Sequence, residues 1–352
     1  MKINKGQFTL STPLQWLKFN LGRGRGHFVR YLTNRFRWHI YPRLGRVSRF
    51  PDHVDIELSS ACDMVCPMCY TVSDDFKKMV THKNIDPDLF RKIVDECAHY
   101  GTYSIRLSFR GEPFLHRKIV ELTRYAKEKG IKEVSTLTNG LRLNPTQFEE
   151  MLDAGLDWLT ISFDGVGETY EKIRRPAKFD EAVEKIRTYK AIKERRGSAK
   201  PVIKVQTVWP AIKDDPQAFY DLFEPIVDQV STNPLMDYLH LDTDIEYEEG
   251  FSCPVLYQRL VIGSDGKVLL CINDELGRHI VGDVNTQSLY EIWHGERLTE
   301  ARAIHRQRRG VELLTPCKAC HLPRKTEVRR FEVDGRVIQL EAYTKRTEVI
   351  GQ

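Results

Sequence analysis

The first 50 residues contain no Asp and no Glu, although they carry eleven Lys or Arg residues. With no acidic residue to balance them, this arm is expected to favour an anionic partner: an acidic lipid surface, a pyrophosphate-bearing substrate or nucleic acid. Aromatic residues interleave with the basic ones in "FVRYLTNRFRWHIYPRL" (28–44). An arm that simply packs these rings on the main domain, with long basic side chains over apolar surface, is the open alternative.

Long apolar runs and secretion signals are also missing. No apolar run reaches the about 18 residues of a membrane span. The start, "MKINKGQFTLSTPLQW", lacks the apolar core and cleavage pattern of a signal peptide. We therefore expect a cytoplasmic protein, peripheral at the membrane if the arm binds acidic lipid. Disulfides rarely persist in that compartment, so the eight cysteines of the chain point first to metal binding.

The cysteines fall into groups of different size. The loop "ACDMVCPMCY" (61–70) holds a trio in C-x3-C-x2-C spacing, at Cys62, Cys66 and Cys69, with no fourth member. A late group consists of Cys253, Cys271, Cys317 and Cys320, and Cys97 stands alone. Four thiolates saturate a [4Fe–4S] cluster, whereas three leave one iron with the open position that a catalytic site requires.

Predicted strands and helices alternate from residue 53 to residue 232. The expected strands are 53–58, 103–109, 132–140 (with its turn), 157–165, 202–209 and 228–232. The expected helices are 87–101, 116–130, 145–155, 179–197 and 216–227. This alternation predicts an α/β fold, a partial (β/α)6 barrel. We expect a basic arm at 1–50, the barrel at 51–240, a domain that carries the late cysteines at 241–325 and a tail with a hairpin at 326–352.

The polar motifs follow the predicted strands, as reactive groups do in such barrels. Together the cysteine trio, "RGEP" (110–113) and the turn "NG" (139–140) resemble the radical S-adenosylmethionine (SAM) superfamily over about residues 52–240. The resemblance implies that the trio holds a [4Fe–4S] cluster whose open iron is chelated by SAM. SAM would be cleaved to a 5′-deoxyadenosyl radical, which abstracts a hydrogen atom from the substrate. It further implies SAM contacts at Gly111, Glu112, Pro113, Asn139, Ser162 and Arg174.

The late cysteines carry a second resemblance. "CPVLYQRLVIGSDGKVLLC" (253–271), a predicted helix at 288–305 and "PCKAC" (316–320) look like the shortened "twitch" form of a SPASM extension. This resemblance implies a small C-terminal α+β iron–sulfur domain at 241–325, with one auxiliary [4Fe–4S] cluster fully ligated by Cys253, Cys271, Cys317 and Cys320. A structural zinc ribbon would use the same four cysteines and stays open as a competitor.

A saturated auxiliary cluster is useful as an electron acceptor, which favours oxidation of a carbinol to a ketone. The cysteine layout resembles that of radical SAM dehydrogenases acting on an aminocyclitol, and we expect a carbohydrate or aminocyclitol substrate. Epimerisation is the rival and needs a hydrogen-atom donor. The one spare thiol, Cys97, is expected to be buried on a helix outside the barrel lumen.

A general base is also required, and Asp274 and Asp244 are the predicted candidates because they lie near the late cysteines or in the inter-domain bridge. An electron donor such as flavodoxin or ferredoxin is expected as a partner. The non-enzyme alternative is a metal-stapled protein that binds an anionic partner through its arm.

Overall fold

The computed structural model describes residues 6–350, so arm residues 1–5 and tail residues 351–352 lie outside the described part. Its centre is a run of six parallel strands in which each predicted strand appears in order. These are β2 (His53–Ile56), β3 (Ser104–Arg106), β4 (Glu133–Thr138), β5 (Trp158–Ser162), β6 (Val202–Val208) and β7 (Gln229–Asn233).

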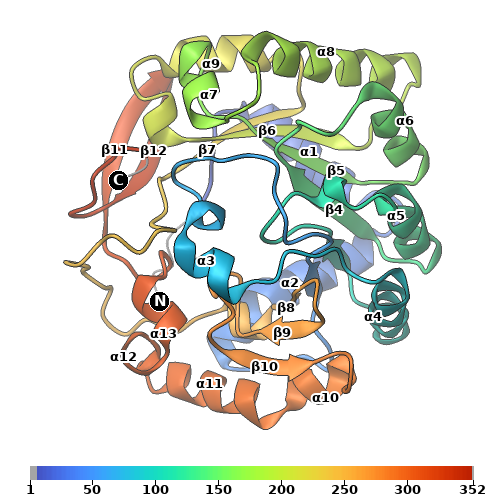
Figure 1. The fold of residues 1–352 in the computed structure, drawn as a ribbon, viewed down its shortest axis with the longest axis vertical. Helices are drawn as coiled ribbons and strands as arrows, with labels where there is room; N and C mark the ends of the chain where they lie inside the picture. Colours follow the sequence, from blue (N-terminus) through green and yellow to red (C-terminus); the bar gives the residue numbers. More distant parts are fainter. Residues whose placement is uncertain (1–5, 351–352) are drawn as a thin grey trace.

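Helices cover the outer side of these strands (Figure 1). They are α4 (Pro87–Tyr100), α5 (Ile119–Glu128), α6 (Pro145–Asp153), α8 (Phe179–Arg195) and α9 (Pro216–Phe223). Local sequence sets their ends: in α4 the Asp86 carboxylate accepts the N–H groups of Asp88 and Leu89, and Gly101 ends the helix at φ 79°. The predicted partial (β/α)6 barrel is confirmed.

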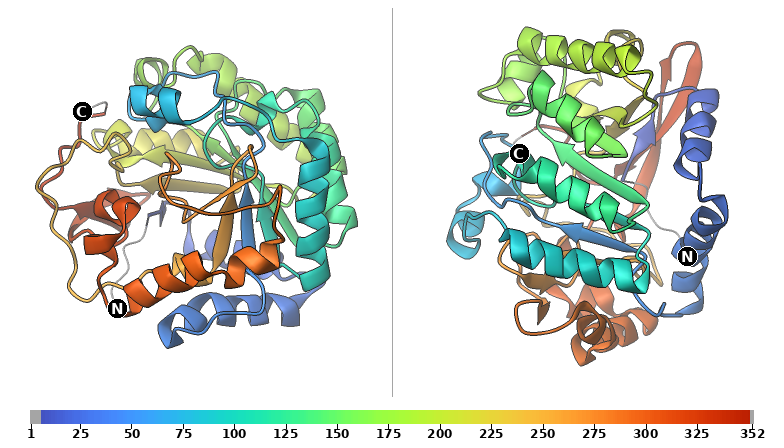
Figure 2. Two further views of the ribbon diagram at one scale, coloured as in Figure 1. Left: turned by 60° about the horizontal axis from the view of Figure 1, so that its bottom comes forward. Right: turned by 90° about the vertical axis from the view of Figure 1, so that its right-hand side faces the viewer.

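The structure adds elements that the alternation did not predict. They are β1 (Phe8–Thr9), α1 (Pro13–Arg23), α2 (Phe28–Leu44), α3 (Asp74–Met79) and α7 (Glu168–Ile173). β1 pairs antiparallel with β7 at the sheet edge. α1 and α2 run along one side of the molecule, while α3 lies on the opposite side (Figure 2, right). The arm is therefore an ordered part of the fold.

The C-terminal region continues the barrel sheet. β8 (Arg259–Ile262) pairs parallel with β2, and β9 (Lys267–Leu269) and β10 (Ile280–Asp283) follow as antiparallel neighbours. The helices are α10 (Leu289–His294), α11 (Glu296–Arg306), α12 (Gly310–Leu313) and α13 (Thr315–Ala319). The helix predicted at 288–305 is broken at Gly295, whose backbone is extended (ψ 161°).

The predicted hairpin in the tail is confirmed. β11 (Thr326–Val333) and β12 (Arg336–Tyr343) pair antiparallel through the turn at Asp334–Gly335. The ring of Phe331 packs on Trp209, with centroids 4.1 Å apart, which fixes the hairpin beside the last barrel strands. Among residues 6–350, no helix has the length and apolar character needed to cross a membrane.

Candidate cofactor and substrate site

The cysteine trio lies in the loop after β2, pressed against the segment after β3. The Glu112 N–H donates to the Ala61 carbonyl at 2.7 Å. A Cβ on Gly111 would stand 2.1 Å from that same oxygen, so only glycine allows the two backbones to approach this closely. Because Ala61 immediately precedes Cys62, this contact sets where the first cysteine stands.

The Glu112 side chain is a buried support for the loop after β4. Its carboxylate accepts the Thr138 hydroxyl at 2.7 Å and the Asn139 N–H at 2.7 Å. Burial raises the pKa of Glu112 to about 7, although these hydrogen bonds act in the opposite direction. This predicted SAM-contact residue therefore joins the ends of two neighbouring strands.

Asn139 connects the same loop to the cysteine trio. Its amide Nδ2 donates to Asp63 Oδ1 at 2.8 Å and lies 3.8 Å from Cys62 Sγ. Arg142 Nε donates to the other oxygen of Asp63 at 2.7 Å. The predicted Asn139 position is thus next to the first cysteine, as a group near a bound cofactor should be.

Arg174 reaches the second cysteine from the end of α7. Its Nη2 pairs with Asp164 Oδ2 at 2.5 Å and its Nη1 lies 3.8 Å from Cys66 Sγ. Burial alone would lower the pKa of Arg174, but the Asp164 carboxylate and Cys66 raise it overall. Ser162, at the end of β5, is 8% exposed. Two of the three trio cysteines therefore have a predicted SAM-contact residue beside them.

The late cysteines form a second, buried group. Cys253, Cys271, Cys317 and Cys320 are each only 7–8% exposed, and all are free thiols. Burial raises the pKa of Cys271 well above its usual value, and Cys317, Cys320 and Cys253 raise it further, so the four lie within electrostatic reach of one another. Such thiols keep their protons until a metal displaces them.

The surroundings of this group suit thiolate ligands. Asn273 Nδ2 and the Leu322 N–H point at Cys320 Sγ from 3.2 Å and 3.4 Å, as hydrogen-bond donors do around metal-bound sulfur.

The competing zinc ribbon would need all four cysteine sulfurs about 2.3 Å from one zinc ion. Within residues 6–350, no three His, Cys, Asp or Glu side chains stand close enough to hold a single metal ion.

A small pocket borders the late cysteine group at Cys320. Its lining comes from the segment after β7, the segment after Cys271 and the end of α13: Met236, Asp237, Tyr238, His240, Asn273, Glu275, Ala319, Cys320 and His321. Burial raises the pKa of Tyr238, and the nearby Glu275 raises it further. Cys69 of the trio and Cys320 of the late group raise this pKa as well, so the Tyr238 hydroxyl is within electrostatic range of both cysteine groups. The ring of Tyr70, next to Cys69, lies 5.3 Å from that of Tyr238.

His240 and Glu275 form an ion pair at this pocket. His240 Nε2 is 2.6 Å from Glu275 Oε1, and the carboxylate is 4% exposed. The adjacent Glu275 carboxylate raises the pKa of His240 above its usual value. His240 also has a left-handed backbone (φ 56°), which is uncommon outside glycine. An imidazole held by a buried carboxylate is a familiar arrangement for proton transfer.

The two acids predicted as bases are not among the residues that line the pocket. Asp274 is buried, but its oxygens accept the N–H groups of Arg278 and His279 at 2.8 and 2.9 Å. Asp244 has a 76% exposed side chain and pairs with Lys345 at 2.9 Å. Asp274 thus stabilises the turn at 274–279 through hydrogen bonds, and Asp244 lies at the surface.

A buried ion pair between Arg110 and Glu57, which the sequence did not indicate, lies next to the site. Arg110 forms two hydrogen bonds with the Glu57 carboxylate, at 2.6 and 2.7 Å, and a third with the Glu275 carbonyl at 3.2 Å. It therefore ties the barrel to the pocket. The only signal in the sequence was an Arg directly before Gly111. Its partners, Glu57 just after β2 and Glu275 in the C-terminal region, are not indicated by any local pattern.

Fold and site together define an iron–sulfur enzyme whose catalytic loop lies at the mouth of a partial barrel. Residues 56–205 match the radical SAM superfamily, and residues 253–321 match an iron–sulfur cluster-binding domain of the SPASM type. The chain is a radical SAM enzyme with a SPASM/twitch-like C-terminal domain. It uses a SAM-binding [4Fe–4S] cluster and an auxiliary [4Fe–4S] cluster, and the two cysteine groups fit them.

Individual relatives resemble parts of the chain. GTP 3′,8-cyclase of Limosilactobacillus fermentum is 30% identical over 146 residues, covering 41% of this chain and 43% of that protein. The structure of BtrN in complex with AdoMet and 2-DOIA has a TM-score of 0.56 at 19% identity, covering 78% of this chain and 94% of that chain. Streptococcus suis SuiB bound to S-adenosylmethionine has a TM-score of 0.54 at 13% identity, covering 83% and 77%.

The matches to the curated relatives cover only part of each relative. The chain spans less than half the length of the curated relatives that it matches. At identities below 20%, the similarity to BtrN and SuiB concerns the fold.

Proposed function

We propose that the protein oxidises a carbinol of a carbohydrate or aminocyclitol to a ketone. The observation that carries this proposal is the use of the thiols. Seven of the eight cysteines fall into the trio and the late group, and the remaining one, Cys97, is fully buried on α4. No thiol is then left to return a hydrogen atom to the substrate, so removal of an electron and a proton is the favoured outcome.

Each cysteine group has a role in this proposal. Cys62, Cys66 and Cys69 would hold the SAM-binding cluster, while the late group would hold the auxiliary cluster. When bound, these groups supply a 5′-deoxyadenosyl radical for hydrogen-atom abstraction and an acceptor for one electron. Gly111, Glu112, Pro113, Asn139, Ser162 and Arg174 would line or support the SAM site, since three of their loops meet the trio.

The chain itself must take up the carbinol proton. We assign this role to His240, because its Nε2 lies 2.6 Å from the Glu275 carboxylate at the pocket that borders Cys320. Glu275 would hold the ring and stabilise the imidazolium that forms. Asp274 and Asp244, the acids named from the sequence, are less suited because both have structural partners.

Epimerisation is kept as a second candidate because of the tyrosine pair. Tyr238 lines the pocket and Tyr70 stands beside it, with ring centroids 5.3 Å apart. A phenol at the pocket could return a hydrogen atom in place of a thiol, and one electron from the external donor with one solvent proton would then restore the phenol. This route would conserve the mass of the substrate and introduce hydrogen from solvent.

The test is anaerobic turnover with SAM and a reductant on a panel of aminocyclitols and sugars, 2-DOIA among them. Oxidation predicts a product two mass units lighter and consumption of SAM once per turnover. Epimerisation predicts unchanged mass in ordinary water and one deuterium from heavy water, lost in Tyr238→Phe. A product of unchanged mass that carries solvent deuterium would refute the dehydrogenase proposal.

The assigned base has its own test. Loss of a positioned base typically costs about 10²–10⁴-fold in rate, so His240→Gln should lower kcat by that order while SAM binding is retained. The active form is neutral His240, whose pKa is raised, so kcat/KM should rise with pH above the usual histidine range. Glu275→Gln should move that rise to lower pH. A profile unchanged in Glu275→Gln would exclude the pair.

The partners follow from the same chemistry. The SAM-binding cluster needs a reductant, and we propose flavodoxin or ferredoxin as the electron donor. The eleven basic residues and missing acids of the arm favour an anionic partner as well.

A further inference from the structure

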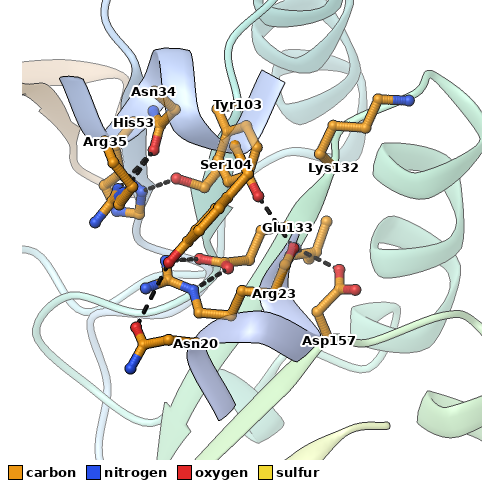
Figure 3. Close-up of polar contacts among 12 residues, drawn as sticks. Asn20, Arg23, Asn34, Arg35, His53, Tyr103, Ser104, Lys132, Glu133 and Asp157 are labelled. Carbon is orange, nitrogen blue, oxygen red and sulfur yellow. Dashed lines mark hydrogen bonds and ion pairs between the residues drawn. The ribbon is translucent and has the colours of Figure 1, made fainter. Parts of the chain in front are cut away.

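The N-terminal arm has an inner face that is firmly attached to the barrel. Arg23 of α1 forms two hydrogen bonds with Glu133 at the start of β4, at 2.7 and 2.8 Å (Figure 3). Phe19 packs edge-on against Trp158 at the start of β5, with centroids 4.8 Å apart. α1 and α2 therefore cover the N-terminal ends of the strands, on the side away from α3 (Figure 2).

The outer face of the same two helices is apolar. Eighteen large apolar side chains in residues 6–350 are exposed, and nine of them lie on α1 and α2. We call these nine the outer arm face: Leu14, Trp16, Leu17, Leu21, Phe28, Val29, Leu32, Phe36 and Leu44, which are 47–79% exposed. Half of the exposed apolar groups thus gather on two helices. Large exposed apolar patches usually mark a binding surface.

The pattern along α2 is the reverse of an ordinary surface helix. Phe28, Leu32 and Phe36 follow one another at four-residue spacing and point to solvent, while Tyr31 and Asn34 are buried. A surface helix normally turns its apolar stripe to the core and its polar stripe to water. On α2 the buried side carries the polar Asn34, and the solvent side carries Phe and Leu. Packing within one chain therefore does not explain the exposed apolar stripe.

Basic side chains are exposed near the outer arm face, and the arm has no acidic residue to balance them. Lys18, Arg25 and Arg43 are exposed on or between α1 and α2, and residues 1–50 contain no Asp or Glu. At the C-terminal end of α2 a hollow is lined by Arg43, Arg306 and Arg308 together with Pro42, Leu44, Gly45, Gly250 and Ser252. No acidic side chain is among these lining residues, so the hollow suits a phosphate group.

We propose that the outer arm face lies in the interface of a bilayer that contains anionic lipid. Trp, Phe and Leu side chains would enter the headgroup boundary, and the Lys and Arg side chains would meet lipid phosphates, as in interfacial helices. A second copy of the chain fits poorly, because two arms rich in Lys and Arg and free of acids would repel each other. Nucleic acid would not use exposed Leu and Val.

This placement leaves the reaction site accessible. α3 and the cysteine loop lie on the opposite side of the molecule from α1 and α2 (Figure 2, right), so the barrel mouth faces away from the bilayer. The proposal does not depend on which reaction the enzyme performs.

The test is co-sedimentation of the reconstituted full-length enzyme with phosphatidylcholine vesicles, with and without phosphatidylglycerol. The apolar variant combines Leu17→Gln, Leu32→Gln and Phe36→Gln. The charge variant combines Lys18→Gln, Arg25→Gln and Arg43→Gln. A matched control, Val328→Gln with Val337→Gln, changes equally exposed apolar groups on the tail hairpin (56% and 65% exposed). SAM cleavage by each variant reports that it remains folded.

Wild type should bind the anionic vesicles, less tightly as salt rises, with a blue shift of Trp fluorescence. The apolar variant should bind on the order of a hundredfold less, since three side chains lose their burial. The charge variant should bind at least on the order of tenfold less tightly than wild type. The control should bind like wild type. Absence of wild-type binding, or equal binding by the apolar variant, overturns the proposal. So does a wild-type dimer without vesicle binding that the apolar variant dissociates.

Discussion

Replacing Gly111 with Ala should disable the catalytic loop through a backbone clash. The new Cβ would stand 2.1 Å from the Ala61 carbonyl oxygen and 2.6 Å from the Ser60 carbonyl carbon. Side chains normally keep at least 3.0 Å, so the two backbones must separate by about 1 Å. Neither neighbour is a flexible side-chain end that could swing aside.

The cost follows from that displacement. Overpacking of this kind destabilises by roughly 1–3 kcal/mol. Loss of the Glu112 N–H to Ala61 hydrogen bond, 2.7 Å long, adds about 1 kcal/mol. We therefore expect Gly111→Ala to lower stability by about 2–4 kcal/mol. Since Cys62 follows Ala61, the trio should also hold less iron.

The assay compares iron content, 5′-deoxyadenosine formation and the thermal midpoint after identical reconstitution. Gly22→Ala is the matched control, because a Cβ at Gly22 meets nothing within 4 Å and φ there is not positive. The late cysteines should still assemble their cluster in Gly111→Ala. A variant with the wild-type midpoint, full iron content and normal SAM cleavage would refute the reasoning that this contact positions the trio.

Three further outcomes are expected. Changing Cys62, Cys66 and Cys69 together to Ala should abolish 5′-deoxyadenosine formation but leave about four irons in the late group, whereas retained SAM cleavage would contradict the assignment. Cys97→Ala should keep SAM cleavage and product formation, at a packing cost of about 1–2 kcal/mol; an inactive variant that still cleaves SAM would implicate this thiol. Burial raises the folded-state pKa of Glu112 from 4.5 to about 7, so stability should fall as pH rises between these values, by up to about 3 kcal/mol, and Glu112→Gln should flatten that slope in denaturation curves.

Much of the barrel could be predicted because its determinants are local. In α4, the cap at Asp86, the apolar spacing and the terminal Gly101 are all read within one short segment. The tail hairpin is similar, since Asp334–Gly335 fixes the turn between two alternating runs. Gly295 shows the limit: the apolar spacing of 288–305 indicated one helix, but the glycine breaks it into α10 and α11.

The sequence by itself determined the two cysteine groups and the chemistry they imply, because ligand type and spacing are properties of the chain. Only the tertiary structure decided that His240 meets Glu275, since these residues come from segments joined by no local pattern. The same holds for Arg110 and Glu57. The tertiary structure also decided which side of α2 faces water. Periodicity shows that α2 has an apolar stripe, but only packing against the strand ends turns Tyr31 inward and leaves Leu32 exposed.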